Sequence, residues 1–132
     1  MKKKHVLLVT LLALLSVNGY SVSQPADAIV GRWFFPARQS SIELYRSGDR
    51  YFGRITEVGG NWKGKFNGTK DQLVLTNLTF NGREWSGGEL IHPQTGSRYD
   101  VALSMQNPQN VLVTVYKGVR LLHKEYELVR EK

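Results

Sequence analysis

The sequence predicts an all-β fold, most simply an eight-stranded antiparallel up-and-down barrel. Apolar and polar residues alternate with a period of two along almost the whole chain after Pro25, and no stretch carries the apolar stripe of a helix. Short turn signals separate the alternating runs, so strands that follow one another in sequence should pair antiparallel. Closure into a barrel would bury the apolar faces together and remove exposed sheet edges. A two-sheet sandwich is the competing arrangement of the same strands.

The alternating runs define the predicted strands and, by their phase, the predicted interior. The strands are expected at residues 29–35, 41–46, 50–58, 72–80, 83–91, 97–105, 111–117 and 120–129. Alternate side chains of a strand share one face. This predicts an inward set of Trp33, Phe35, Ile42, Leu44, Tyr99, Val101, Leu103, Met105, Val111, Val113 and Val115. A barrel of eight strands is just wide enough to be filled by side chains or to hold one small ligand.

The N-terminus has the pattern of a secretory signal peptide. Residues 1–5 are basic, residues 6–17 are apolar, and polar residues follow. The apolar run is shorter than the roughly 20 residues of a membrane span. Small residues at Ser21 and Ser23 predict cleavage after Ser23, with cleavage after Ala28 as the alternative. We therefore expect residues 1–23 to be removed and residues 24–132 to form one domain, exported to the periplasm or secreted, without a membrane span.

The composition narrows the classes of partner. The chain has no cysteine, so neither disulfides nor thiolate chemistry can operate. Three lysines lie in the leader, which leaves 15 basic residues against 11 acidic ones, a net charge of +4. The basic residues are scattered along strands, as on a solvated face. Together with export, this argues against nucleic acid and leaves anionic polymers or proteins of the cell envelope as partners.

Residues 85–105 predict a hairpin whose turn chemistry sets the strand register. Pro93 fixes its own backbone and Gly96 can adopt a left-handed conformation, while His92 occupies the place of a turn-starting acceptor. Gly87 and Gly88 in the incoming strand predict a bulge or the close approach of a large neighbour such as Trp85 or Tyr99. The hairpin is therefore expected to be structural.

The residues that could carry chemistry do not form a convincing site. Ser86, His92 and Asp100 lie on one hairpin, but strand phase sends their side chains in different directions. His123, Glu125 and Glu127 share one side of the last strand, which is more typical of a solvent face than of a metal site. We expect no catalytic residue, no metal and no cofactor, and a protein that is not an enzyme.

The one long connection, residues 59–71, is rich in glycine and lysine and contains Trp62 and Phe66. It could form a flap over the barrel mouth or a contact surface for a partner. Alternatively, the two aromatic side chains could fold back and plug one end of the barrel.

Several motifs resemble one family of small exported bacterial proteins, known as domain of unknown function 2147. They are Gly31-Arg32-Trp33, ELYRSGDRYFGRI from residue 43, WSGGELIHPQTGSRY from residue 85 and LLHKEYELVR from residue 121. The spacing of Trp85, Gly87, Gly88, Pro93, Gly96 and Tyr99 is the most specific part. His92 stands where that family usually has an acid. The resemblance implies a lipocalin-like barrel and no established activity.

Gly31-x-Trp33 on a first strand also resembles the lipocalin signature. In that signature the tryptophan closes one end of the barrel beneath a basic side chain of the last strand. The resemblance implies that Arg130 or Arg120 plays this part, through a cation–π contact.

A barrel of this kind predicts a binding protein for a small apolar or amphipathic ligand. Trp62, Phe66, Tyr99 and Tyr116 are expected to line or cover the entrance, and Arg54 or Arg98 to orient an acidic head group. Structural roles are expected for Gly31, Trp33, Trp85, Gly87, Gly88, Pro93, Gly96 and Arg130. The alternative function is an interaction module that contacts an envelope partner through its outer surface and residues 59–71.

Overall fold

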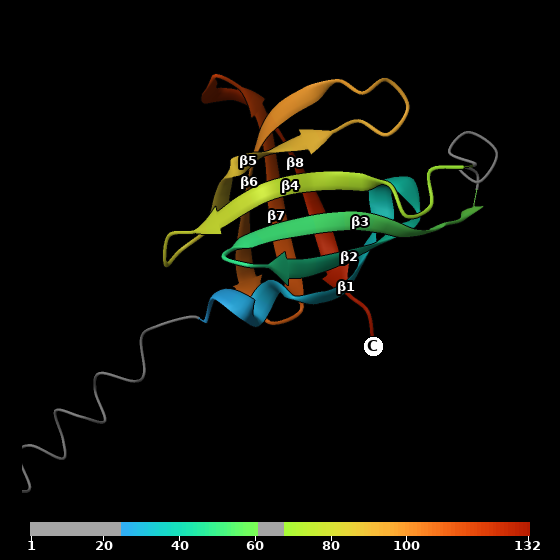
Figure 1. Cartoon of the computed structure of the whole chain (residues 1–132), viewed down its shortest axis with the longest axis horizontal. Helices are drawn as coiled ribbons and strands as arrows, with labels where there is room; N and C mark the ends of the chain where they lie inside the picture. Colours follow the sequence, from blue (N-terminus) through green and yellow to red (C-terminus); the bar gives the residue numbers. More distant parts are fainter. Residues whose placement is uncertain (1–24, 61–67) are drawn as a thin grey trace, which may run out of the picture.

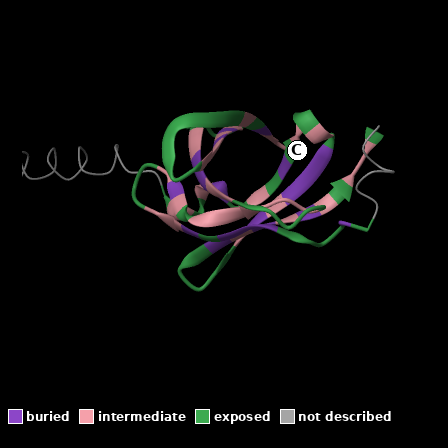
Figure 2. Ribbon diagram, turned by 90° about the horizontal axis from the view of Figure 1, so that it is seen from above, coloured by how far each residue is buried: buried purple, intermediate pink, exposed green. Residues whose placement is uncertain are grey.

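The computed structural model describes residues 25–60 and 68–132. Its strands close into a barrel in which each strand pairs antiparallel with the next, and the last pairs back with the first (Figure 1). Seen from above, the strand ribbons form a ring (Figure 2). The up-and-down barrel is therefore confirmed over the sandwich. The expected leader and residues 61–67, with Trp62 and Phe66, lie outside the described residues.

The strand boundaries follow the predicted ones closely. The strands are β1 (Gly31–Phe35), β2 (Ser40–Ser47), β3 (Arg50–Val58), β4 (Leu73–Phe80), β5 (Trp85–Ile91), β6 (Arg98–Asn107), β7 (Asn110–Lys117) and β8 (Val119–Arg130). Two short 3₁₀ turns, η1 (Ala26–Ile29) and η2 (Pro36–Arg38), flank β1 and were not predicted. Ile29, expected to begin the first strand, instead ends η1, where its side chain is buried in the barrel core. No helix in the described part of the chain is long and apolar enough to cross a membrane.

One end of the barrel is filled by a tryptophan core. Trp33 and Trp85 are fully buried there together with Leu44, Leu103 and Leu128. The whole predicted inward set is buried or partly buried, as the period-two pattern requires. The indole N–H groups both donate to η1: Trp33 Nε1 to the Ile29 carbonyl at 2.9 Å and Trp85 Nε1 to the Ala26 carbonyl at 3.0 Å. The turn η1 therefore caps this closed end.

Arg130 covers the closed end from outside. Its guanidinium carbon lies 4.2 Å from the centre of the Trp33 ring, and Nη2 donates to the Ala28 carbonyl at 2.7 Å. Gly31 permits this contact because a Cβ there would lie 2.9 Å from Arg130 Nη1, and its φ of +143° disfavours other residues. Of the two candidates for the basic partner of Trp33, Arg130 is the one found. Arg120 lies elsewhere and pairs with Glu84.

The β5–β6 hairpin has the predicted turn chemistry. The His92 Nδ1 atom accepts hydrogen bonds from the backbone N–H groups of Gln94 and Thr95, at 3.1 and 3.3 Å. Gly96 has a φ of +74° and donates its N–H to the His92 carbonyl at 2.9 Å. The imidazole of His92 thus serves as the turn acceptor, a part that a carboxylate could also play. The side chain of His92 therefore has a structural role in this turn.

Of the two alternatives predicted for Gly87 and Gly88, the structure shows the bulge. The register between β5 and β6 shifts between Ser86 and Glu89, and Gly87 has a φ of +83°. A Cβ on Gly88 would overlap the carbonyl oxygen of Thr76 on β4. The alternative, close approach by Trp85 or Tyr99, is not found, because the nearest atoms to a Cβ on Gly88 belong to the backbone of β4.

Candidate ligand-binding cavity

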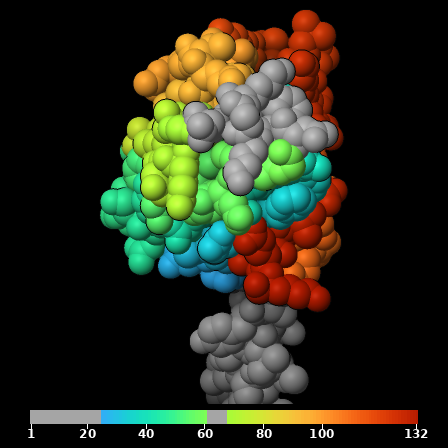
Figure 3. Space-filling view, turned by 90° about the vertical axis from the view of Figure 1, so that its right-hand side faces the viewer, coloured from blue at the N-terminus to red at the C-terminus, as the bar shows by residue number. Residues whose placement is uncertain are grey.

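The end of the barrel opposite the tryptophan core holds an open cavity of about 650 Å³. This volume lies within the roughly 300–1,000 Å³ of typical small-molecule sites. Its mouth is bordered by the β5–β6 turn and by the beginning of β8, which both lie at the top of Figures 1 and 3. The eight strands thus divide their interior into a packed half and a hollow half.

The cavity wall is mostly apolar. Strands β1 to β8 all contribute side chains, because inward positions beyond the tryptophan core continue toward the mouth. The apolar and aromatic lining residues are Phe35, Ile42, Ile55, Val58, Val74, Leu75, Leu90, Ile91, Pro93, Tyr99, Val113, Val115, Tyr116, Leu122, Tyr126 and Leu128. Phe35 and Tyr126 pack edge to face at 5.6 Å between ring centres. Such a wall suits an apolar ligand or ligand segment.

The ionisable side chains of the wall, tyrosines apart, are all basic or imidazole. They are Arg38, His92, Lys117, His123 and Lys124, and the described lining contains no carboxylate. Lys117 Nζ lies 5.2 Å above the Tyr99 ring, and the described residues offer neither Lys117 nor Lys124 an ion pair with a carboxylate. A low-dielectric pocket with cations on one side favours an anionic group at that position.

The structure brings some of the predicted ligand-binding residues together and separates others. Tyr99 and Tyr116 line the cavity near its mouth. Arg54 points outward from β3 and pairs with Glu43 at 2.6 Å and with Asp71 at 3.3 Å. Arg98 pairs with Glu89 at 3.0 Å, also outside the cavity. The expectation that Arg54 or Arg98 faces the ligand does not match these positions, because carboxylates on neighbouring strands hold both side chains at the surface.

The cationic residues of the mouth were missed by the sequence analysis. Lys124 shares the inward face of β8 with Tyr126 and Leu128, so strand phase from Leu128 could have indicated it. Arg38 belongs to η2, a turn that period-two reasoning does not cover. Glu125 and Glu127 face outward, as the solvent-face interpretation predicted, whereas His123 lies at the rim of the cavity.

His123 has hydrogen-bond acceptors at both ring nitrogens. Nδ1 lies 2.6 Å from the Arg120 carbonyl oxygen and Nε2 lies 2.9 Å from Glu125 Oε1. Only the doubly protonated ring can donate to both. The hydrogen bond to Glu125, followed by that to the Arg120 carbonyl, therefore raises the pKa of His123 above its usual value. A positive charge is favoured beside the mouth in mildly acidic solution.

The groups considered for hydrolysis are engaged elsewhere. Asp100 Oδ2 accepts the Gly118 N–H at 2.8 Å, and His92 Nδ1 accepts the turn amides described above. Across residues 25–60 and 68–132, no three His, Asp or Glu side chains are grouped so that they could hold a metal ion. Among the described residues, the cavity is therefore the candidate site.

The comparisons with known proteins agree with this architecture. The solved structure described as "Protein HP1028 from the human pathogen Helicobacter pylori belongs to the lipocalin family" matches with a TM-score of 0.62 and 16% sequence identity. The match covers 79% of this chain and 83% of that chain. At this identity the likeness concerns the fold alone. No curated protein matches the chain.

A family model covers the strands of the barrel from the first to the last. The model described as "Uncharacterized protein conserved in bacteria (DUF2147)" matches residues 31–130. These residues run from Gly31, which makes room for Arg130, to Arg130 itself, and include every strand. The chain therefore belongs to this bacterial family, and its barrel is lipocalin-like.

Proposed function

We propose that this protein is an exported binding protein that holds one small amphipathic molecule in its barrel. The apolar part of the ligand lies between the walls of the cavity, and an acidic head group lies at the mouth near Lys117 and Lys124. The observation that carries this proposal is an apolar cavity whose described charged lining residues, Arg38, Lys117 and Lys124, are all cationic.

The size and location of the cavity support the proposal. A volume of about 650 Å³ is ample for a small amphiphile, whereas a filled barrel would have favoured a purely surface function. In the described residues the closed end is sealed by Trp33, Trp85 and η1, which supports entry of a ligand from the mouth. An amphiphile that enters with its apolar end first leaves its head group beside the lysines.

Ligand binding should depend on the charge of the head group and on Lys124. For the delipidated chain 24–132, we expect a long-chain fatty acid to bind more tightly than the alcohol or the trimethylammonium amphiphile of equal chain length. Lys124→Gln should weaken fatty-acid binding about two- to tenfold, because one charge-assisted contact is lost. Displacement of a fluorescent fatty acid measures these affinities.

Two further variants define the site. Arg98→Gln removes one positive charge from the outer face and should leave the affinity unchanged. Val115→Phe narrows the cavity and should weaken the binding of all three amphiphiles. Equal affinities for Val115→Phe and the parent would show that the cavity is not the binding site.

The alternative function, contact with an envelope protein or polymer, concerns the outer surface. Exposed apolar side chains at the beginning of β8 favour a surface contact of some kind. Of these exposed residues, Leu122 also lines the rim of the cavity, whereas Val119 and Leu121 do not line it. The surface contact and the cavity therefore depend on largely different side chains.

A further inference from the structure

Exposed apolar side chains gather at the turn between β7 and β8. Val119, Leu121 and Leu122 are 66, 87 and 82% exposed, whereas the other exposed large apolar residues in the described chain are at most 38% exposed. We call residues 117–124 the β7–β8 tip. It stands at the mouth of the cavity, because Lys117, Leu122 and Lys124 also belong to the cavity lining.

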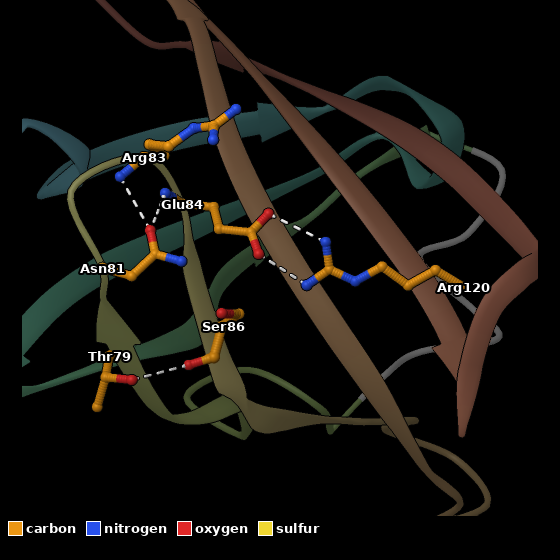
Figure 4. A network of polar contacts seen from close by, with 6 residues as sticks. All are labelled: Thr79, Asn81, Arg83, Glu84, Ser86 and Arg120. Carbon is orange, nitrogen blue, oxygen red and sulfur yellow. Dashed lines mark hydrogen bonds and ion pairs between the residues drawn. The ribbon is translucent and has the colours of Figure 1, made fainter.

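The β7–β8 tip is held in place by polar contacts. Lys117 pairs with Val119 and Tyr116 with His123, so residues 120–122 bulge from the ladder. The Gly118 N–H donates to Asp100 of β6, as described above. Arg120 forms a double ion pair with Glu84, at 2.7 and 3.2 Å (Figure 4).

Glu84 is itself positioned by the β4–β5 turn. The Asn81 Oδ1 atom accepts the backbone N–H groups of Arg83 and Glu84, both at 2.9 Å (Figure 4). The fixed carboxylate draws Arg120 toward the barrel, and its hydrogen bond raises the pKa of that guanidinium. Charged side chains usually extend into solvent and leucines are usually buried. At this tip Arg120 is held against the barrel by Glu84, whereas Leu121 and Leu122 are exposed.

The charges around these leucines are positive. Residues 117–124 contain Lys117, Arg120, His123 and Lys124 and no carboxylate. Glu84 is engaged with Arg120 and Glu125 with His123, and the two lysines have no ion pair with a described carboxylate. The β7–β8 tip therefore combines exposed apolar side chains with neighbouring positive charges.

We infer that the β7–β8 tip docks onto an anionic lipid surface. Leu121, Leu122 and Val119 would enter the boundary between head groups and acyl chains, while the lysines remain at the level of the lipid phosphates. Three protruding side chains are few for a protein partner, since stable interfaces bury about 800 Å² on each side. For a lipid surface, a small apolar protrusion with cations around it is sufficient.

Docking in this way would place the cavity mouth against the lipid. Leu122 would contact the acyl region while Lys124, two residues later on β8, faces the cavity. The inference does not need the proposed function, because the tip would dock whether or not the cavity is occupied. The two can fail separately.

Because the chain has no cysteine, a single introduced cysteine can be labelled specifically to detect docking. In the chain 24–132, Leu121→Cys provides one thiol for an environment-sensitive fluorophore, and Val30→Cys provides the matched control at the closed end. With vesicles of phosphatidylethanolamine and phosphatidylglycerol, emission from position 121 should shift to the blue and that from position 30 should not. Phosphatidylcholine vesicles should produce little shift at either position.

Flotation of the unlabelled chain with the same vesicles tests the apolar side chains. Val119→Ser with Leu121→Ser should reduce the partition coefficient at least tenfold, because burial of both apolar side chains is lost. Val30→Ser with Phe34→Ser removes two exposed apolar side chains elsewhere and should not reduce it. Near-ultraviolet circular dichroism checks that both variants remain folded.

Three results would overturn the inference. The first is equal association with anionic and phosphatidylcholine vesicles. The second is undiminished flotation of the Val119→Ser, Leu121→Ser variant. The third is self-association of the parent chain in sedimentation velocity that this variant abolishes while neither chain floats, which would assign the tip to contact between copies of the chain.

Discussion

At the scale of single residues, Gly31, Trp33 and Arg130 act as one unit. Gly31 leaves space for the guanidinium, the guanidinium covers the indole, and the indole donates to η1. The resemblance to a lipocalin signature indicated these residues, and the geometry explains why they occur together. A side chain at Gly31 would displace Arg130 and adopt an unfavourable backbone conformation.

Trp33→Ala should be strongly destabilising. The side chain is fully buried, so its removal leaves a large cavity, and we expect the free energy of unfolding to fall by about 3–5 kcal/mol. Urea denaturation of the parent and the variant measures the difference. Phe34→Ala is the control, because Phe34 is the exposed neighbour on the same strand and its loss should cost about 1 kcal/mol or less. Coincident midpoints for Trp33→Ala and the parent would contradict the burial.

His123 should titrate above its usual range, and Glu125 should be the main cause. Because the pKa of His123 is higher in the folded state than in the unfolded state, the protonated ring stabilises the fold. This stabilisation is complete below the unfolded pKa of about 6.5 and is lost as the pH rises through the folded pKa. NMR titration of the imidazole protons should show the midpoint falling in Glu125→Gln. Glu127→Gln, with its carboxylate on the same face but bonded to Asn110, should leave the midpoint unchanged. A midpoint insensitive to Glu125→Gln would show that the ion pair is not formed.

At the scale of elements, η1 belongs to the barrel although it precedes the first strand. Its backbone carbonyls accept from Trp33, Trp85 and Arg130, and its Asp27 accepts from the Tyr51 hydroxyl at 2.6 Å. Burial, followed by the hydrogen bond to Asp27, raises the pKa of Tyr51 to about 12. Because η1 accepts hydrogen bonds from several barrel side chains, it has a structural role although it lies near the N-terminal end of the described residues.

Chains with different N-termini should reveal the contribution of η1. A chain that begins at Ile29 lacks the Ala26 and Ala28 carbonyls and should lose about 3 kcal/mol or more, because buried donors are left unsatisfied. A chain that begins at Gln24 retains them. Urea denaturation of both chains, with one beginning at Pro25 as the control, measures the loss. Equal stability of all three chains would show that η1 is dispensable. The expected loss would favour leader cleavage after Ser23, which keeps η1, over cleavage after Ala28, which removes most of it.

At the scale of the whole molecule, the fold was predictable because its signals are local. Period-two alternation and turn residues identify eight strands, and short turns determine their antiparallel order. Strand phase also identified the buried set, including Val101 and Leu103. These features require only knowledge of neighbouring residues.

The charged residues of the site were not predictable in the same way. Arg54 is opposite Glu43 in the β2–β3 register, and that pairing, unknown from sequence, keeps the arginine at the surface. Arg38 lies in a 3₁₀ turn, which period-two reasoning does not cover. Lys124 is the exception, because strand phase from Leu128 indicates its inward side. A cavity also depends on how far side chains fill the barrel, which a binary pattern does not specify.

The pairing of β1 with β8 has a consequence for the order of folding. The strands that close the barrel are the first and the last, and Trp33 is opposite Arg130 in the register. A growing chain therefore cannot complete its barrel until β8 is available. Until then β1 and β7 are open edges that can pair with another chain. The pairing of β1 with β8 protects the folded protein from aggregation by removing its open edges. This protection is absent during most of the synthesis of the chain.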